Sequence, residues 1–309
     1  MAKKVLITGA NGFIGTALQK YFKKKYPSFK IFEIDVKIAS PSRRLIQCRL
    51  TNLKETAKVV SSLKPDYIFH LAGGRTTSEQ GLLRGNVLTT NCLLKAVKQV
   101  DRYDPCIIIP GSAAEYGLTR PAGKLIKETI SAQPVSLYGY IKYMQTSLGL
   151  MYVRLGLNVR IARIFNICGY GMSPALALGQ FARQIALIER KRGPAVIQTG
   201  NLKSKRDYLD VSDVCSAMVK IAQRGKAGEI YNVCSGKSFA IQELLDRLIH
   251  FAQDDNIVVR SNNSSAPGVN VSVGSCAKIK NVVGWKPEID IDQSLKNTVQ
   301  YYRQLLSKK

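Results

Sequence analysis

A glycine triplet near the start of the chain constrains the fold more than any other feature. Gly9, Gly12 and Gly15 are spaced G-x-x-G-x-x-G, directly after the apolar run 4–8 and at the head of a helical pattern over 14–25. Gly9 permits a tight turn, Gly12 lets a pyrophosphate approach the backbone, and Gly15 allows close helix–strand packing. Free N–H groups at the helix start then face the phosphates. The pattern predicts a dinucleotide-binding turn; a plain glycine turn is the structural alternative.

Strand-like and helical patterns alternate along the first half of the chain. Strands are expected over 4–8, 30–34, 67–71, 106–110 and 158–164, and helices over 53–63, 87–100 and 136–155. This alternation predicts an α/β protein with a doubly wound parallel sheet. The second half is more mixed, with helices expected over 174–191, 212–224, 241–252 and 291–306, strands over 195–199 and 230–234, and a loop over 262–270.

The balance of charges is the unusual part of the composition. The 309 residues include 46 Lys and Arg against 21 Asp and Glu, which gives a net charge of +25. Such an excess attracts anions, including nucleotides and nucleic acid. The densest basic clusters are short, at 23–25, 43–44 and 203–206. A polyanion site and a merely solvated basic surface both remain open, and no specific nucleic-acid partner is expected.

The numbers of cysteines and histidines exclude several kinds of site. Seven cysteines occur without C-x-x-C spacing, so a disulfide framework or structural zinc is not expected. The two histidines, His70 and His250, leave no metal site expected, and His70 is predicted to pack at a buried strand end. No apolar run reaches the roughly 18 residues of a membrane span, and no secretory segment opens the chain, so a cytoplasmic location is expected.

An acidic residue ends the second predicted strand. Asp35 there can accept hydrogen bonds from both adenosine ribose hydroxyls and would repel a 2′-phosphate, which favours NAD(H) over NADP(H). Arg43 and Arg44 follow shortly and can reach a 2′-phosphate, so NAD(H) or NADP(H) is expected. An exposed turn carboxylate is the structural alternative for Asp35.

Three residues form a candidate acid–base group. Tyr138 and Lys142 lie four residues apart on a predicted helix and so share one face. An adjacent ammonium stabilises a phenolate and lowers the phenol pKa. Ser112 follows another predicted strand, and strand carboxyl ends line the site in this architecture. Tyr140 and Tyr143 compete for the role, but neither has Lys four residues on. A packing tyrosine and a turn serine are the structural alternatives.

These motifs and several others resemble those of the extended short-chain dehydrogenase/reductases, which are nucleotide-sugar epimerases, dehydratases and reductases. The resemblance covers nearly the whole chain and rests on segments 8–15, 69–72, 86–90, 112–117, 138–142 and 163–166. It implies Ser112, Tyr138 and Lys142 as the catalytic triplet. It also implies a cofactor site made of Gly9, Asn11, Gly12, Phe13, Ile14, Gly15, Asp35, Leu71, Ala72, Asn86, Tyr138 and Lys142.

The resemblance also divides the chain. It implies a Rossmann domain from 1–166 and 207–235, and a smaller mixed α/β lobe that binds a nucleotide-diphosphate sugar from 167–206 and 236–309. Asn86 is implied as support for the site near Lys142, and Asn166 as a contact to the substrate diphosphate. A homodimer is implied through the helices over 87–100 and 136–155.

Within the family, four segments are most similar to the branch that reduces the C4 keto group of GDP-linked 6-deoxy sugars. They are 111–117, 181–185, 200–207 and 231–237. The similarity implies Arg183 and Arg206 as diphosphate or nucleotide ligands, which suits the bidentate chemistry of arginine.

Three positions depart from the family pattern. Dehydratases carry an acid just after the Ser/Thr, where this chain has Ala113 and Ala114, and Glu115 comes one place too late. Dehydration is therefore disfavoured. Arg49 stands where the family has an adenine-binding Asp, and segment 260–267 lacks the branch's Arg-rich pattern.

Three functions follow in order. The first is NAD(P)H-dependent reduction of a nucleotide-linked 4-keto-6-deoxy sugar, in which Tyr138 donates a proton, Ser112 hydrogen-bonds the developing alkoxide and Lys142 keeps Tyr138 acidic. The alternative is a nucleotide-sugar 4-epimerase with tightly bound NAD. A non-catalytic nucleotide or RNA binder comes third, and the complete triplet argues against it.

Overall fold

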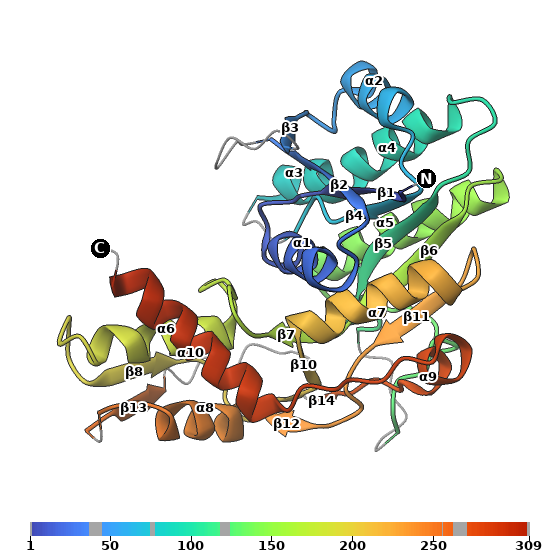
Figure 1. Cartoon of the computed structure of the whole chain (residues 1–309). Helices are drawn as coiled ribbons and strands as arrows, with labels where there is room; N and C mark the ends of the chain where they lie inside the picture. The colour runs from blue at the N-terminus through green and yellow to red at the C-terminus, as the bar shows by residue number, and fades with distance from the viewer. Residues whose placement is uncertain are drawn as a thin grey trace.

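The computed structural model describes residues 2–36, 45–74, 78–117, 124–254, 256–261 and 271–307. Its largest sheet has seven parallel strands in the order β11-β6-β5-β4-β1-β2-β3 (Figure 1). They are β1 (Lys4–Thr8), β2 (Lys30–Asp35), β3 (Leu45–Gln47), β4 (Tyr67–His70), β5 (Cys106–Ser112), β6 (Val159–Ile164) and β11 (Ile230–Val233). The predicted doubly wound parallel sheet is confirmed. The predicted loop over 262–270, Arg43 and Arg44 lie outside the described residues.

Helices cover both faces of this sheet (Figure 1). Val5 and Ile7 of β1 pack toward one face and Leu6 toward the other, as the alternation of side chains along a strand requires. One face is covered by α1 (Phe13–Lys25), α7 (Val211–Arg224) and α9 (Ala277–Val283), the other by α2 (Leu53–Leu63), α4 (Thr89–Lys98) and α5 (Leu137–Arg154). Burial on both faces explains why the strands read as continuous apolar runs.

The helix predicted over 87–100 begins earlier than expected and is irregular. It starts as α3 (Glu79–Leu82), continues as a π-helix (Leu83–Leu88) and only then becomes α4. A π-turn inserts an extra residue into each turn and commonly marks a functional position. Here it carries Asn86, a buried polar residue whose amide bonds to backbone groups. A buried polar residue interrupts the apolar periodicity, so the sequence pattern does not predict this part of the helix.

A second group of elements surrounds a separate apolar core, which includes Leu178, Leu244 and Leu295. Its helices are α6 (Ala177–Ile188), α8 (Ile241–His250) and α10 (Ile291–Ser307) (Figure 1). Its strands are β7 (Asn166–Cys168), β8 (Val196–Thr199), β9 (Lys205–Arg206), β10 (Tyr208–Asp210), β12 (Phe239–Ala240), β13 (Val258–Ser261) and β14 (Val271–Ser272). Each of these seven strands has two to four residues. The sequence predicted β8, at 195–199, whereas the others are too short for a period-two pattern to predict. The division at 1–166 with 207–235 and 167–206 with 236–309 stays a prediction.

The outer edge of the sheet at β11 is closed by side chains. The Asn232 N–H donates to Oε1 of Glu128 at 2.8 Å, and Lys278 Nζ donates to the Ile230 carbonyl at 2.6 Å. Asn232 Nδ2 also donates to the carbonyl of Ile126 at 2.9 Å. The first two contacts satisfy backbone groups that an open edge strand would present to another chain.

Among the helices that the structure describes, none is long and apolar enough to cross a bilayer.

Candidate active site

The glycine turn lies where the strand order reverses, between β1 and β4. Gly9 has φ +64°, and a Cβ there would lie 2.6 Å from the carbonyl oxygen of Leu71 and 2.7 Å from the Ala72 nitrogen. A Cβ at Gly15 would collide with the carbonyl oxygen of Gly9. The turn, the start of α1 and the end of β4 can therefore meet only with glycine at both positions. Ligands of open α/β sheets bind at such a reversal point.

The first turn of α1 offers its backbone N–H groups without a competing side chain. Gly12 is the N-cap residue, and no capping side-chain hydrogen bond is described at this helix start. A Cβ at Gly12 would meet just the carbonyl oxygen of Gly9, at 3.2 Å, among the described atoms. Phe13 and Ile14 follow directly and are half-buried. The backbone N–H groups of this first helical turn therefore suit a pyrophosphate ligand.

Asp35 closes the turn from the end of β2. Its Oδ2 accepts a hydrogen bond from the Asn11 N–H at 2.9 Å, and its Oδ1 accepts one from the Val36 N–H at 2.8 Å. The carboxylate is half-buried beside the glycine turn. The residues predicted to hold the adenosine end of a dinucleotide are thus brought together, while their contact to a ribose stays a prediction.

Asn86 fixes the loop that follows β4. Its Oδ1 accepts from the Gly74 N–H at 3.1 Å, and its Nδ2 donates to the carbonyls of Gly74 and Leu82 at 3.1 and 2.9 Å. The side chain is only 1% exposed. It therefore supports the loop backbone rather than presenting its amide to solvent.

Ser112 ends β5 and begins a 3-10 turn (Ala113–Glu115). Its hydroxyl accepts from the Ala114 N–H at 3.2 Å, while its own N–H donates to Oε1 of Glu115 at 2.6 Å. The two contacts form a capping box, which fixes the backbone on both sides of the serine.

Glu115 is a buried structural anion beneath Ser112. Its Oε2 accepts from Nη2 and Nε of Arg163 at 2.7 and 3.1 Å, and its Oε1 accepts from the Thr146 hydroxyl at 3.1 Å. Burial raises the pKa of Glu115, while Arg163 and the hydrogen-bond donors act in the opposite direction. With its oxygens committed to these donors, Glu115 is placed to support Ser112.

Tyr138 and Lys142 occupy the first two turns of α5, which Ser136 caps through the Gly139 N–H at 3.1 Å. The start of α5 presses on the turn after Ser112, because a Cβ at Gly139 would lie 2.5 Å from the Ala114 carbonyl oxygen. Lys142 Nζ donates at 2.6 Å to the carbonyl of Pro110, two residues before Ser112. The structure thus brings the predicted triplet to the carboxyl end of β5, with Tyr138 half-buried.

The ammonium of Lys142 lies in a desolvated position, and its residue is 5% exposed. Burial lowers the pKa of Lys142 to about 8, and the carboxylate of Glu115 opposes this shift. Below that pH the site holds a cation close to the end of β5, as a phenol acid requires.

The predicted substrate residues lie on the second group of elements. Asn166 is on β7, and its Nδ2 donates to the Asp207 carbonyl at 3.0 Å. Arg183 is exposed on α6. Arg206 is half-buried on β9, and its Nη1 donates to the Lys205 carbonyl at 2.8 Å. Their contact with a substrate stays a prediction.

The sequence motifs did not predict a role for a buried carboxylate, Asp207, that joins the loop after β11 to the second group of elements. Asp207 is fully buried between β9 and β10, and burial raises its pKa to about 6. Its Oδ1 accepts from both the N–H and the hydroxyl of Ser235 at 2.7 Å. Its Oδ2 accepts from the N–H groups of Gly236 and Gly274 at 2.9 and 3.2 Å. Asp207 ends the segment 200–207 that the family resemblance singles out, but no role was predicted for it.

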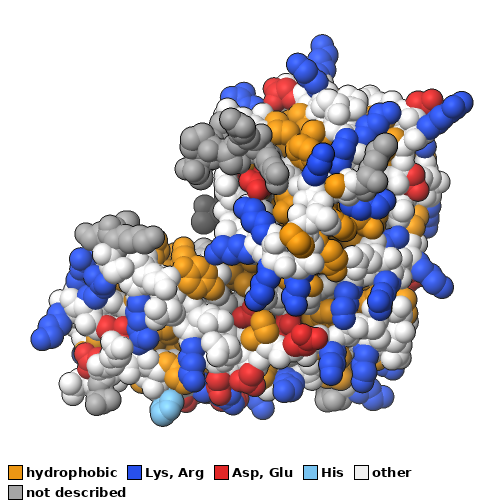
Figure 2. Space-filling model, viewed as in Figure 1, with side chains coloured by type: hydrophobic (Ala, Val, Ile, Leu, Met, Phe, Trp, Pro, Cys, Tyr) orange, Lys and Arg blue, Asp and Glu red, His pale blue; other side chains and the backbone are white. Residues whose placement is uncertain are grey.

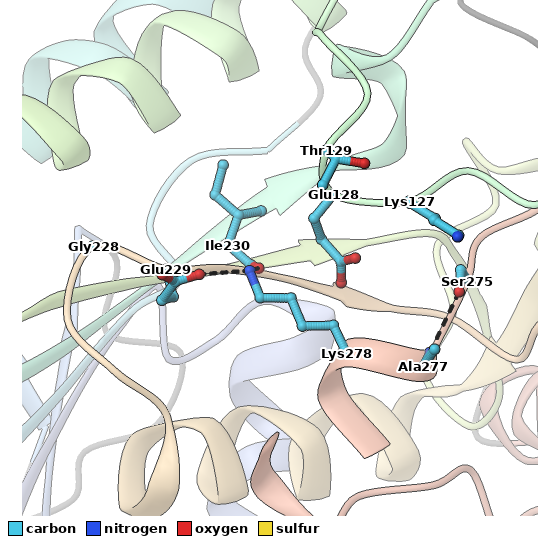
Figure 3. Close-up of a pocket in the computed structure, with 9 residues that line it drawn as sticks. All are labelled: Lys127, Glu128, Thr129, Gly228, Glu229, Ile230, Ser275, Ala277 and Lys278. Atoms are coloured by element: carbon cyan, nitrogen blue, oxygen red, sulfur yellow. Dashed lines mark hydrogen bonds and ion pairs between the residues drawn. The ribbon is translucent and has the colours of Figure 1, made fainter. Parts of the chain in front are cut away.

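A cavity of about 480 Å³ lies elsewhere, against the edge strand β11 (Figure 3). Figure 3 shows Lys278 in an ion pair with Glu229, at 2.6 Å, across its floor. The cavity meets β11 at Ile230, its first residue, whereas the glycine turn and Ser112 follow the carboxyl ends of their strands. It is therefore not part of the candidate active site.

A parallel sheet with a glycine turn at its reversal point, and a Tyr–Lys pair beside a strand-end serine, defines a class of dinucleotide-dependent enzymes. The chain belongs to the NAD dependent epimerase/dehydratase family, whose model matches residues 5–234. The resemblance noted in the sequence is thereby confirmed, and the chain is an oxidoreductase-type enzyme of this family. The expected nicotinamide coenzyme is confirmed at the level of the family.

Individual relatives are more specific. The GDP-6-deoxy-D-mannose reductase of Pseudomonas aeruginosa is 31% identical over 303 residues, with 96% of each chain covered. The GDP-6-deoxy-D-talose 4-dehydrogenase of Aggregatibacter actinomycetemcomitans is 23% identical, with 91% of each chain covered. The solved structure of RMD from Pseudomonas aeruginosa, complexed with NADPH, superposes with a TM-score of 0.84 at 28% identity, over 98% of this chain and 100% of that one.

Proposed function

We propose that the protein reduces the C4 keto group of a GDP-linked 4-keto-6-deoxy sugar with NADH or NADPH. The observation that carries the proposal is the full-length similarity to a GDP-6-deoxy-D-mannose reductase, in a chain whose Ser112 ends β5 and whose Tyr138 and Lys142 lie on the helix that packs against that end. The buried supports of Ser112 and Lys142 suit groups that hold a substrate oxygen in a fixed position.

A reduced nicotinamide coenzyme, when bound, supplies the hydride that reaches C4 of the sugar. Tyr138 donates its phenolic proton to the C4 oxygen as negative charge develops there, so that the carbonyl becomes a secondary alcohol. The Ser112 hydroxyl donates a hydrogen bond to the same oxygen. Lys142 stabilises the phenolate left on Tyr138 until solvent returns the proton.

The residues around the glycine turn would hold the coenzyme. The N–H groups at the start of α1 bind the pyrophosphate, and Asp35 binds the adenosine ribose. Asp35 favours NADH, whereas the relative from Pseudomonas aeruginosa was solved with NADPH. Both coenzymes therefore belong in the assay.

The test is a spectrophotometric assay of the purified protein. With GDP-4-keto-6-deoxy-D-mannose and either coenzyme, the reduced nicotinamide absorbance should fall in proportion to the alcohol formed. Absence of turnover with both coenzymes, in a protein that still binds one of them, would overturn the proposal.

A 4-epimerase is the second candidate, because the family and its chemistry include that reaction and a putative UDP-glucose 4-epimerase of Methanocaldococcus jannaschii is 24% identical over 97% of this chain. The same triplet would serve it, with NAD retained between two opposite hydride transfers. Interconversion of UDP- or GDP-hexoses without added coenzyme would favour this reaction over the reductase.

The basic charge does not by itself favour a nucleic-acid binder. On the face in Figure 2, Lys and Arg side chains are spread over both parts of the molecule rather than gathered in one patch. RNA affinity that persists at high salt would favour binding without catalysis, because non-specific binding weakens with ionic strength.

We also propose that two copies pair through α5 and the neighbouring helix. Exposed apolar side chains lie on one face of α5 and at its C-cap residue, each at least 45% exposed: Leu137, Tyr140, Met144, Met151 and the C-cap Leu155. A continuous apolar stripe on a helix surface is typical of a helix–helix interface.

A further inference from the structure

A line of hydrogen-bonded, buried polar side chains runs from Lys142 to the glycine turn. Apart from Lys142, its members have no role in the proposed mechanism. Its members come from β1, β4, α4 and α5 and are each 5% exposed or less. They are Thr8, His70, Thr90, Gln145 and Lys142. Buried polar groups without hydrogen bonds are costly, so a fully bonded line of this kind has one defined arrangement.

At one end, Gln145 fixes the Lys142 ammonium. Lys142 Nζ donates to the Pro110 carbonyl and to Oε1 of Gln145, and Nε2 of Gln145 donates to the Thr90 hydroxyl oxygen at 2.8 Å. An ammonium has three N–H donors. Two are committed to these acceptors, which leaves one for a phenol or a coenzyme hydroxyl.

In the middle of the line, Thr90 determines the direction of each bond. Its hydroxyl hydrogen goes to the Asn86 carbonyl, which can only accept. The Thr90 oxygen therefore accepts from both Gln145 Nε2 and His70 Nε2, the latter at 3.0 Å. His70 must then carry its proton on Nε2.

At the other end, the remaining ring nitrogen of His70 is an acceptor. Nδ1 of His70 accepts from the Thr8 hydroxyl at 2.9 Å, and the Thr8 oxygen accepts from the Ala72 N–H at 3.1 Å. Burial, with a smaller contribution from Lys142, lowers the pKa of His70 to about 3. The neutral ring and its single tautomer are thus maintained across the physiological range, and the line ends on the backbone beside Gly9.

We propose that Gln145 is a positioning residue that orients the Lys142 ammonium, and that Thr90 and His70 hold Gln145 in the orientation this requires. The inference rests on the proposed function for its role in catalysis, but the coupling between Gln145 and Lys142 is a property of the chain alone. The charged or titratable groups that face Lys142 are Tyr138, one turn earlier on α5, His70 from β4 and Glu115 after β5. Glu115 is itself paired with Arg163.

Two substitutions at Gln145 should act on Lys142 in opposite directions. Gln145→Met removes the acceptor and leaves the buried ammonium less stabilised, so the pKa of Lys142 should fall further. Gln145→Glu keeps an acceptor and adds a negative charge, so the pKa should rise. Gln300→Glu, which makes the same change at an exposed position of α10, is the matched control.

The first readout is the pH dependence of urea unfolding, which needs neither coenzyme nor substrate. Lys142 has a folded pKa of about 8 and an ordinary value of 10.5, so between these values the unfolded chain binds more protons and wild-type stability should rise with pH. In Gln145→Met the rise should begin at a lower pH. In Gln145→Glu the unfolding free energy should rise less steeply with pH, because the folded and unfolded states differ by up to about one bound proton fewer than in the wild type.

The second readout is turnover in the reductase assay. Gln145→Met should lower kcat about tenfold with little change in the KM of the sugar, because a misplaced group weakens the transition state more than the ground state. Gln145→Glu should restore part of kcat and move the alkaline limit of activity to higher pH. Gln300→Glu should match the wild type in both readouts.

The outcomes separate the two proposals. Opposite pH shifts in the two variants support the positioning role. If the wild type shows no turnover, the proposed function is overturned, but the positioning role still stands on these shifts. Unchanged pH dependence, or shifts in one direction that follow the loss of stability, overturn the positioning role. If Gln145→Met does not fold, the direction of the shift in Gln145→Glu decides alone.

Discussion

At the scale of single residues, the proposed catalytic groups depend on a buried ion pair between Glu115 and Arg163. Ser112 is held through its backbone N–H by Glu115, and Glu115 is neutralised by Arg163 at 2.7 Å. Both members of this ion pair are at most 3% exposed. Removing one member of such a pair leaves the charge of the other member buried, without a counter-charge or water to stabilise it.

Glu115→Gln should therefore destabilise the fold strongly. The amide keeps the shape of the side chain but leaves the Arg163 guanidinium buried without a counter-charge, so the free energy of unfolding should fall by about 3–5 kcal/mol. Urea unfolding measures the change. Glu243→Gln, in an exposed i,i+4 pair with Arg247, is the control and should stay within about 0.5 kcal/mol. Equal effects of the two would contradict the structural role of Glu115.

Tyr138→Phe should lower turnover at least about a hundredfold, because the variant lacks the proton that the developing alkoxide requires. Coenzyme binding, followed by nicotinamide fluorescence, should persist. Tyr143→Phe serves as the control, since its side chain is 41% exposed on the same helix and is not one of the stripe residues. Near-normal turnover in Tyr138→Phe would remove the phenol from the mechanism.

At the scale of elements, α5 is the part that assembles the site. Its first turn presses on the turn after β5, its inward face carries Lys142, Gln145 and Thr146, and its outward face carries the apolar stripe. One helix thus contacts the ends of β5, the π-helix side of the molecule and the proposed second copy. Its packing at Gly139 sets how closely Tyr138 approaches Ser112.

Gly139→Ala tests this packing against intrinsic helix preference. Alanine is favoured over glycine in a helix by about 1 kcal/mol, but the added Cβ would lie 2.5 Å from the Ala114 carbonyl oxygen. The expected result is a net loss of about 1–3 kcal/mol in unfolding free energy, together with reduced turnover.

Gly149→Ala, on the same helix, is the matched control for this substitution. Its Cβ would approach the flexible tips of Ile109 and Ile161, at 3.0 and 3.3 Å, rather than backbone. It should retain turnover and stay within about 1 kcal/mol of the wild type. A Gly139→Ala variant as active and stable as Gly149→Ala would show that the approach of α5 to the serine turn is not tight.

At the scale of the whole molecule, the two groups of elements supply different parts of the candidate site. The large sheet carries the glycine turn and the triplet, while Asn166, Arg183 and Arg206 lie on β7, α6 and β9. Asp207 ties strand ends of both groups together through Ser235, Gly236 and Gly274. A substrate that contacts both groups would fix their relative position.

The α5 stripe predicts the assembly state. Sedimentation analysis should give twice the 34.1 kDa of the chain, and Met144→Glu should convert the protein to a monomer because it places a charge in the middle of the apolar stripe. Val258→Glu introduces the same charge at an exposed position on β13 and should leave the assembly intact. A wild type that sediments as a monomer would contradict pairing through α5.

Much of the fold was predictable because its elements carry their own local signals. Burial on both faces makes β1, β4, β5 and β6 continuous apolar runs, and α2 begins and ends at the predicted residues. The signals fail where tertiary contacts replace them. The π-helix around Asn86 is stabilised by the Gly74 loop, and β9, β12 and β14 have two residues each, too few to carry a pattern.

The sequence by itself determined the parallel sheet and the glycine turn, and it indicated the candidate pair Tyr138 and Lys142, because glycine spacing and an i,i+4 pair act over a few residues. Only the tertiary structure decided what surrounds them. Glu115 meets Arg163 from 48 residues away, and Gln145 meets Thr90 from 55. His70, expected merely to pack, bonds Thr8 across 62 residues. Such contacts form when strands and helices distant in the sequence become neighbours, so no local pattern contains them.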